Sequence, residues 1–253
     1  MKSAKRILAV LLCAALLISV LCACGKTTDA GADTNTNDDS IAQQLYDADV
    51  AAPDLTNATE ITLSGADDVT ITDGGVYVLT GTLTDGRVLV NAPGADVTLV
   101  LRDTDITCTD SSALYIYKAA NVLVYLQDGT ASTLTDGSSY DDSDSFSSTA
   151  DEEPNACLYS KSDLIIAGGG TLTVTGNANN GITGKDTLKI EGTAVNVTAA
   201  NHGINGKDCL VLKQANVTVT SGGDALRATN DSDSALGCVL IGASALTLTA
   251  GED

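Results

Sequence analysis

Two segments of the sequence place the same carboxylate chemistry at a fixed interval. Residues 181–190 read GITGKDTLKI and residues 203–212 read GINGKDCLVL, so Asp186 and Asp208 hold equivalent positions 22 residues apart. If such repeats stack, the two carboxylates lie about 5 Å apart and repel each other unless a cation or water separates them. Calcium takes about six to eight oxygen ligands from carboxylates, amides and water. We therefore predict a calcium-binding column, and Lys185 and Lys207 are the alternative source of neutralising charge. The predicted ligands are Asp186, Asp208, Asp224, Asn180 and Asn201.

The only histidine of the chain, His202, directly precedes the second segment. Imidazole is a poor calcium ligand. Three roles therefore stay open, namely a polar residue stacked in an amide-rich turn, a sugar contact, or a catalytic base. No second histidine or Ser-His-Asp order accompanies it. We predict no catalytic residue and favour a protein that is not an enzyme.

Three further residues are candidates for contact with a ligand. Arg227 stands where the two earlier repeats carry Thr183 and Asn205, and an ion pair with Asp224 is its alternative role. Tyr115 and Tyr117 are two residues apart, so they share one face of a strand. The candidate ligand-binding residues are therefore Tyr115, Tyr117, His202 and Arg227.

These residues belong to repeats that alternate apolar and polar side chains. Leu188, Ile190, Val195 and Val197 recur 22 residues later as Leu210, Leu212, Val217 and Val219. Such a period with several short strands is typical of a solenoid. We predict an all-β, right-handed, single-stranded parallel β-helix with these aliphatic pairs stacked inside. The positions of Gly181, Gly184, Gly203 and Gly206 predict turns that need a positive φ. A further repeat start at Asp253 predicts that the sequence is truncated at its C-terminus.

The N-terminal sequence predicts export and a lipid anchor. MKSAKR is followed by an apolar run and by LCACG at residues 21–25, the pattern of a lipoprotein signal with Cys24 as the lipidated residue. An uncleaved membrane anchor is the alternative. We predict a signal peptide at 1–23, a flexible lipid-anchored tether at 24–50, and a β-helix domain at 51–253. The protein is then expected on the cell membrane, facing outward.

The charge of the chain excludes one class of partner. The formal net charge is −20, with 33 acidic and 13 basic residues. Nucleic acid binding needs a basic footprint, so we predict no nucleic acid partner. We expect a monomer. An acidic stretch at 136–155 predicts a long loop without the fixed spacing of an EF-hand. Cys209 and Cys238 share a repeat position, which leaves a disulfide and two free thiols as alternatives.

Five segments in this order resemble one known family: VYVLTGTLTDGRVLVNAP, ASTLTDGSSY, NGITGKD, HGINGKD and TSGGDAL. The resemblance is to a bacterial carbohydrate-binding domain family with a polysaccharide-lyase-like right-handed β-helix, and it covers roughly residues 58–253. It implies non-catalytic binding of plant-type or acidic polysaccharide at the cell surface, together with calcium. The carbohydrate-binding domain would then be the β-helix at 51–253, with Tyr115, Tyr117, His202 and Arg227 as its carbohydrate-binding residues. A calcium-dependent polysaccharide lyase and a structural adhesin or spacer are the alternative functions.

Overall fold

The computed structural model describes residues 41–141 and 154–251, which form one α-helix and twenty β-strands. The predicted signal peptide, the lipidation site Cys24 and most of the predicted acidic loop lie outside the described residues. Within the described part of the chain, no helix has the length and apolar character needed to cross a membrane.

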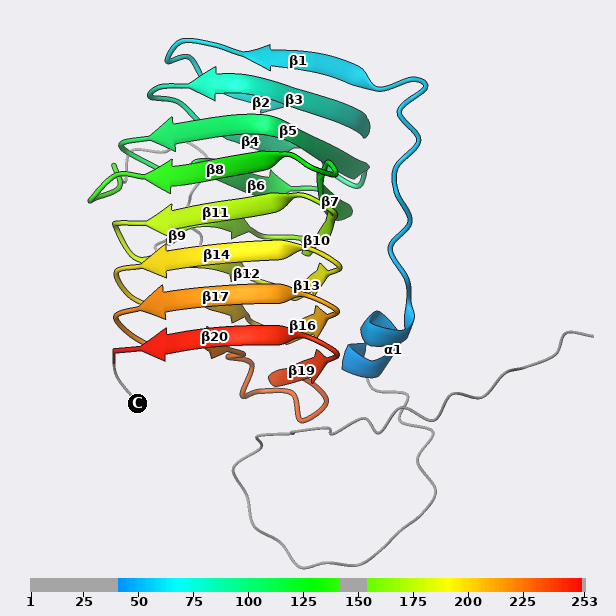
Figure 1. The fold of residues 1–253 in the computed structure, drawn as a ribbon, viewed down its shortest axis with the longest axis vertical. Helices are drawn as coiled ribbons and strands as arrows, with labels where there is room; N and C mark the ends of the chain where they lie inside the picture. Colours follow the sequence, from blue (N-terminus) through cyan, green and yellow to red (C-terminus); the bar gives the residue numbers. More distant parts are fainter. Residues whose placement is uncertain (1–40, 142–153, 252–253) are drawn as a thin grey trace, which may run out of the picture.

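All strand pairs are parallel, and they form two sheets (Figure 1). In the larger sheet, the 13-residue strand β5 pairs through its first half with β7 and through its second half with β8, so it joins two faces. Its thirteen strands are β1 (Thr59–Leu63), β3 (Gly75–Leu83), β5 (Asp96–Cys108), β7 (Asn121–Leu126), β8 (Ala131–Asp136), β10 (Asp163–Gly168), β11 (Thr171–Gly176), β13 (Thr187–Glu191), β14 (Ala194–Ala199), β16 (Cys209–Lys213), β17 (Asn216–Ser221), β19 (Cys238–Gly242) and β20 (Ala245–Ala250).

The smaller sheet contributes the third face. Its seven strands are β2 (Val69–Ile71), β4 (Val88–Asn91), β6 (Leu114–Lys118), β9 (Ala156–Ser160), β12 (Asn180–Gly184), β15 (Ile204–Gly206) and β18 (Leu226–Arg227).

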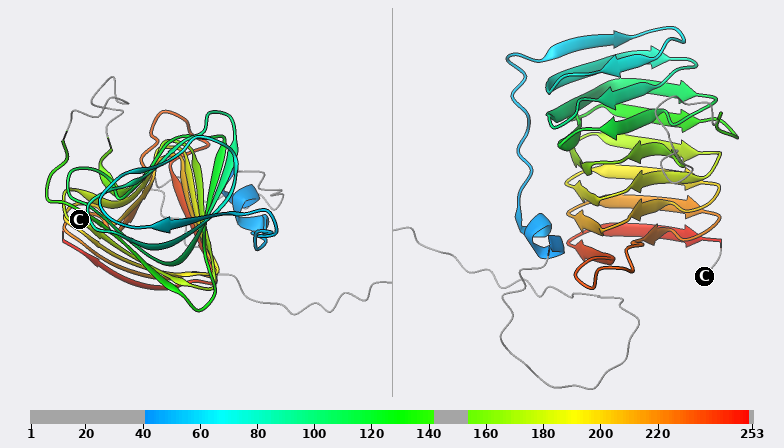
Figure 2. Two further views of the ribbon diagram at one scale, coloured as in Figure 1. Left: turned by 90° about the horizontal axis from the view of Figure 1, so that it is seen from above. Right: turned by 180° about the vertical axis from the view of Figure 1, so that it is seen from behind.

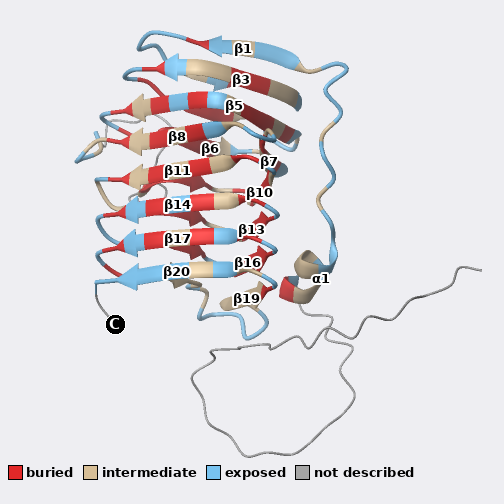
Figure 3. Ribbon diagram, viewed as in Figure 1, coloured by how far each residue is buried: buried red, intermediate tan, exposed pale blue. Residues whose placement is uncertain are grey.

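The 22-residue period sets the strand register. Strands β12, β13 and β14 pair with β15, β16 and β17, which places Leu188 beside Leu210 and Val195 beside Val217. The predicted stacking of aliphatic side chains is confirmed. Valine and threonine fit a pleated strand that is buried on one face. Alternate residues of strands such as β8, β11 and β14 are therefore buried, as the striped colouring of Figure 3 shows. The interior consists of Leu, Ile, Val, Ala and Cys.

The repeated glycines allow close packing and do not adopt the positive φ that was predicted. Positive φ angles occur at other glycines, such as Gly168 and Gly192. Gly181 and Gly203 instead lie where a Cβ would come within 2.2 Å of the Cγ1 atoms of Val197 and Val219. The prediction of a positive φ is wrong because these positions require close packing of backbone against the valine of a neighbouring strand.

The predicted flexible tether is wrong at its C-terminal end. Residues 41–47 form α1 (Ile41–Asp47), which lies against β16 and β19, and the following residues run along the stack to β1 (Figures 1 and 2). The helix packs Ala42, Leu45 and Tyr46 against an apolar patch that includes Val211 and Leu240. Sequence polarity suggested a solvated linker, but this patch on the outer face of the larger sheet gives the segment a partner.

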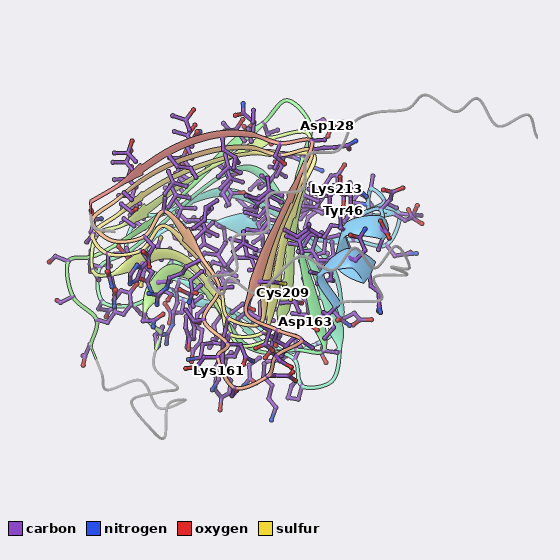
Figure 4. The ribbon with its side chains drawn as sticks, turned by 90° about the horizontal axis from the view of Figure 1, so that it is seen from below. Tyr46, Asp128, Lys161, Asp163, Cys209 and Lys213 are labelled. Atoms are coloured by element: carbon purple, nitrogen blue, oxygen red, sulfur yellow. The ribbon has the colours of Figure 1, made fainter. Side chains whose placement is uncertain are left out.

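Buried charges fasten the segment that follows α1. Lys189, which is 2% exposed, contacts the carbonyl oxygen of Ala48 and lies 2.5 Å from Glu191 Oε2. Lys213 Nζ lies 2.5 Å from Asp49 Oδ1 and 3.6 Å from Glu191 Oε1. Figure 4 shows Lys213 and Tyr46 together beside α1. This network joins residues 48–49 to β13 and β16.

Candidate functional site

The outer face of the smaller sheet changes from aromatic to polar along its length. The register aligns Tyr115, Tyr159, Thr183, Asn205 and Arg227 across β6, β9, β12, β15 and β18. Side chains alternate between the two faces of a strand. The inner face therefore holds the aliphatic residues, and these five side chains share the outer face.

His202 is the centre of the polar part. Its Nδ1 atom accepts a hydrogen bond from the backbone N–H of Asp224 at 3.0 Å, and Arg227 Nη1 lies 2.7 Å from its Nε2. Arg227 also lies 3.5 Å from Asp224 Oδ2, so the predicted ion pair is present. Asn180 Oδ1 accepts from the backbone N–H of His202 at 3.1 Å. The cluster thus brings together residues from three successive repeats.

Two atoms of this cluster are buried without a hydrogen-bond partner among the described residues. Asn205 is 6% exposed and its Oδ1 accepts no hydrogen bond, and the Nε atom of Arg227 donates none. A buried polar group that lacks a partner costs about 1–3 kcal/mol. Native structures leave few such groups, and a bound ligand is one explanation. Here one acceptor and one donor lie at paired positions of β15 and β18.

A row of lysines runs beside the cluster. Lys161, Lys185 and Lys207 each follow the last residue of a strand, and backbone hydrogen bonds keep them in line: Lys185 N–H donates to Ser160 at 2.8 Å and Lys207 N–H donates to Gly184 at 2.9 Å. Lys185 and Lys207 form no ion pair within the described residues, and Lys207 is exposed. Asp163, Asp186 and Asp208 follow these lysines closely in the sequence, so the row places cations and carboxylates side by side.

The two predicted tyrosines do lie together, but only one is accessible. Their rings are 6.0 Å apart in an edge arrangement. Tyr115 is fully buried beside Tyr159, with the guanidinium of Arg87 5.9 Å from its ring centre. Tyr115 therefore offers no exposed ring face for stacking on a sugar, and its predicted sugar contact stays a prediction. Tyr117 is half-buried, and Lys161 Nζ lies 4.8 Å from its ring centre.

The five predicted calcium ligands do not meet at one point. Asn180 and Asp224 belong to the cluster at the start of the smaller sheet's strands, whereas Asp186 and Asp208 follow their ends. These ends are about 13 Å apart along β12. Asn201 instead donates through Nδ2 to Asn179 at 2.9 Å. Among the described residues, no three acidic, His or Cys side chains are close enough to hold a metal ion.

The carboxylate pair that remains is electrostatically strained. Burial first, and then the charges of Asp163 and Asp208, raise the pKa of Asp186, while Lys207 opposes this shift. Asp208 Oδ1 accepts from Asn230 Nδ2 at 2.7 Å. The predicted alternative, in which lysine supplies the neutralising charge, is consistent with the effect of Lys207.

Asn205 and the three lysines were not among the predicted binding residues. The repeat nevertheless indicates three of them. It aligns Asn205 with Arg227, and it places Lys185 and Lys207 at the same position of the GKD segments. The 22-residue period does not align Tyr159 with these residues, because Tyr159 and its strand partner Thr183 are 24 residues apart.

The outer face formed by β8, β11, β14, β17 and β20 is different in chemistry. Its aligned outward residues are mainly threonines, such as Thr175, Thr198 and Thr220, and they include no lysine or arginine. This neutral face provides positions for control substitutions.

Comparison with known proteins places these features in a family. A family model described as "Carbohydrate-binding domain-containing protein" matches residues 65–253. A protein of the same description from Acetivibrio thermocellus is 41% identical over 133 residues, which are 52% of this chain. The matched region spans only 45% of that relative's length. A solved structure, the gadolinium derivative of the polysaccharide lyase-like protein from C. thermocellum, has a TM-score of 0.67 and 33% identity, over 72% of this chain and 78% of the other.

Proposed function

The chain belongs to the family of carbohydrate-binding domain-containing proteins, and from this premise we propose that it binds acidic polysaccharide without cleaving it. The binding surface is the polar cluster of His202, Asn205, Asp224 and Arg227 with its adjoining row of lysines. The observation that carries the proposal is the pair of buried unpartnered atoms, Asn205 Oδ1 and Arg227 Nε.

An acidic sugar offers the groups that this surface lacks. A uronate carboxylate accepts charge-assisted hydrogen bonds from a guanidinium or an ammonium, and a sugar hydroxyl donates to an amide oxygen. Arg227 Nε and Lys207 suit the carboxylate, and Asn205 Oδ1 suits the hydroxyl. Successive lysines are one strand spacing of about 4.8 Å apart. A linear polyanion that runs along the row therefore meets several cations at once.

The proposed scaffold is a right-handed parallel β-helix. Strands β12, β13 and β14 lie on three faces, and each pairs in parallel with the strand 22 residues later. This arrangement supports the proposal. A solenoid adds repeats without new contacts elsewhere. Insertion of a second copy of residues 181–202 after residue 202 should therefore leave the circular dichroism spectrum per residue unchanged. Loss of folding would contradict this architecture.

Calcium association is part of the proposal, through Asp186 and Asp208 rather than through all five predicted ligands. A divalent cation beside these carboxylates would relieve the repulsion that raises the pKa of Asp186, and water would complete its coordination. Calcium titration followed by thermal unfolding tests this step. A midpoint that does not change with calcium, or that changes equally in the D186N/D208N variant, would exclude it.

The N-terminal sequence supports the proposed location. We place the protein on the outer side of the cell membrane as a monomer, with lipid on Cys24. Metabolic labelling with palmitate should label the full-length chain but not the C24A variant. Equal labelling of both would refute the anchor.

Isothermal titration with a polygalacturonate oligomer tests the binding surface. We expect R227M to weaken binding about tenfold or more, since a hydrogen bond to a charged group contributes about 1.5–3 kcal/mol. N205A should weaken binding about two- to tenfold, since a neutral hydrogen bond contributes about 0.5–1.5 kcal/mol. The control T220A, on the neutral face, should bind like the unsubstituted protein. Equal loss in T220A, or unchanged affinity in R227M, would refute this site. Growth of unsaturated-product absorbance during the titration would instead indicate a lyase.

A further inference from the structure

Cys209 and Cys238 are paired residues on adjacent parallel strands, β16 and β19. Their Sγ atoms are 3.4 Å apart. Paired residues of a parallel sheet have a Cα separation of about 5 Å, within the range of about 4.4–6.8 Å that a disulfide spans. We infer that Cys209 and Cys238 form a disulfide that ties β19 to the preceding repeat.

The position of this pair in the fold gives the cross-link a purpose. The two cysteines are 29 residues apart, whereas the paired residues Thr187 and Cys209 are 22 apart, so the bond closes the longest of the last repeats. β18 has only two residues, and most of β19 is only half-buried. The segment between them is therefore held by few strand hydrogen bonds. A covalent bond at the first residue of β19 would compensate for this weak pairing.

The other two described cysteines behave differently. Cys108 and Cys157 belong to the aliphatic interior and are nearly or fully buried. Cys108 Sγ lies 3.4 Å from Asp110 Oδ1. Neither lies opposite another cysteine in the strand register. The pairing therefore identifies one pair among the four described thiols, and Cys108 and Cys157 serve as internal controls.

Access to the pair is asymmetric. Cys209 is fully buried within the patch covered by α1, whereas Cys238 is partly exposed. Burial raises the pKa of the Cys209 thiol to about 12, and the neighbouring Cys238 adds to the shift. Cys238 is therefore the sulfur that an external reagent reaches first.

The oxidant is a disulfide of a small molecule or of an exchange protein. The Cys238 thiolate attacks that disulfide, forms a mixed disulfide and releases one thiolate. Cys209, as its thiolate, then attacks Cys238 Sγ and releases the second thiolate. Two protein thiols are oxidised, one external disulfide is reduced to two thiols, and the two thiol protons pass to the released thiolates. Because the Cys209 thiolate is scarce at neutral pH, the closing step should accelerate as the pH rises.

Peptide mapping by mass spectrometry tests the pair in the full-length chain. After equilibration with oxidised glutathione, a peptide containing Cys209 should be found linked to one containing Cys238, and reductant should separate them. The C108A/C157A variant should retain the link and C238A should lose it. Absence of the linked peptide, or linkage of Cys209 to another cysteine instead, would overturn the inference.

Thermal unfolding provides a second measurement. Oxidised protein should unfold on the order of 5–10 °C above reduced protein, since a bond across a loop of this length restricts the unfolded chain. The C209A/C238A variant should show the same midpoint with and without reductant. A linked peptide without any rise in the midpoint would overturn the stabilising purpose while leaving the bond itself in place.

Discussion

The buried ion network beneath the N-terminal segment gives the sharpest quantitative prediction. Glu191 lies between Lys189 and Lys213, and its Oε1 is 3.5 Å from the backbone N–H of Val50. Although burial lowers the pKa of Lys213, its pairing with Asp49 and Glu191 has the larger combined effect, and the pKa is raised. Glu191 is also the counter-ion of the buried Lys189, whose Nζ lies 2.5 Å from its Oε2. Removal of the Glu191 carboxylate would leave this buried ammonium without its counter-ion.

The expected effect of E191A is large for a single substitution on the outside of a sheet. Removing one partner of a buried ion pair costs about 3–5 kcal/mol. For a domain of this size each kcal/mol lowers the unfolding midpoint by about 2–4 °C. E191A should therefore lower the midpoint by about 6–20 °C. Residues 41–50 should also become more sensitive to protease, because Ala48 and Val50 lose part of their attachment.

A matched control separates the charge from the packing. In K189M/E191L both charges are replaced by apolar side chains of similar volume, and such replacements are often neutral or stabilising. Thermal unfolding followed by circular dichroism, with limited proteolysis of the same samples, measures both effects. The reasoning is refuted if E191A shifts the midpoint by less than about 1 °C, or if the double variant is as unstable as E191A.

Three further predictions address the turns and the stacked repeats. D186N removes a carboxyl group whose pKa is raised in the folded protein. The stability that such a group contributes is present at low pH and is lost as the pH rises above the ordinary pKa of 3.8. D186N should therefore be more stable than the unsubstituted protein at pH 7 without calcium but not at pH 3, and an equal difference at both pH values would contradict this. G203A should lose about 1–3 kcal/mol in urea unfolding, since its Cβ would lie 2.6 Å from the carbonyl oxygen of Ala225; an unchanged denaturation midpoint would show that the backbone yields. A243G should raise the free energy of unfolding or leave it unchanged, because Ala243 has a φ of 51°, which favours glycine. A decrease of more than about 1 kcal/mol would argue against backbone strain at this position.

The repeat made the strand stacking predictable. Because equivalent strands of successive repeats pair in register, aliphatic residues at the same repeat position lie side by side on the inner face. Leu188 and Leu210, and likewise Val195 and Val217, are therefore paired as expected. The alignment of Arg227 with Asn205 was visible for the same reason.

Features that depend on contacts between distant segments were not predictable. The docking of α1 depends on an apolar patch more than 150 residues away along the chain, and residues 41–50 alone do not identify that partner. Likewise, Tyr115 and Tyr117 share a strand face, but only the tertiary structure buries one of them.

The sequence by itself determined the period, the aliphatic interior and the residues that recur at each turn, since these follow from side-chain alternation and repeat length. Only the tertiary structure decided which recurring residues meet. It placed Asn180 and Asp224 at one end of the short strands and Asp186 and Asp208 beyond the other, so one predicted metal site became a polar cluster and a separate carboxylate pair. The physical reason is that repeat spacing fixes distances between neighbouring strands, whereas distances along a strand depend on where each turn begins.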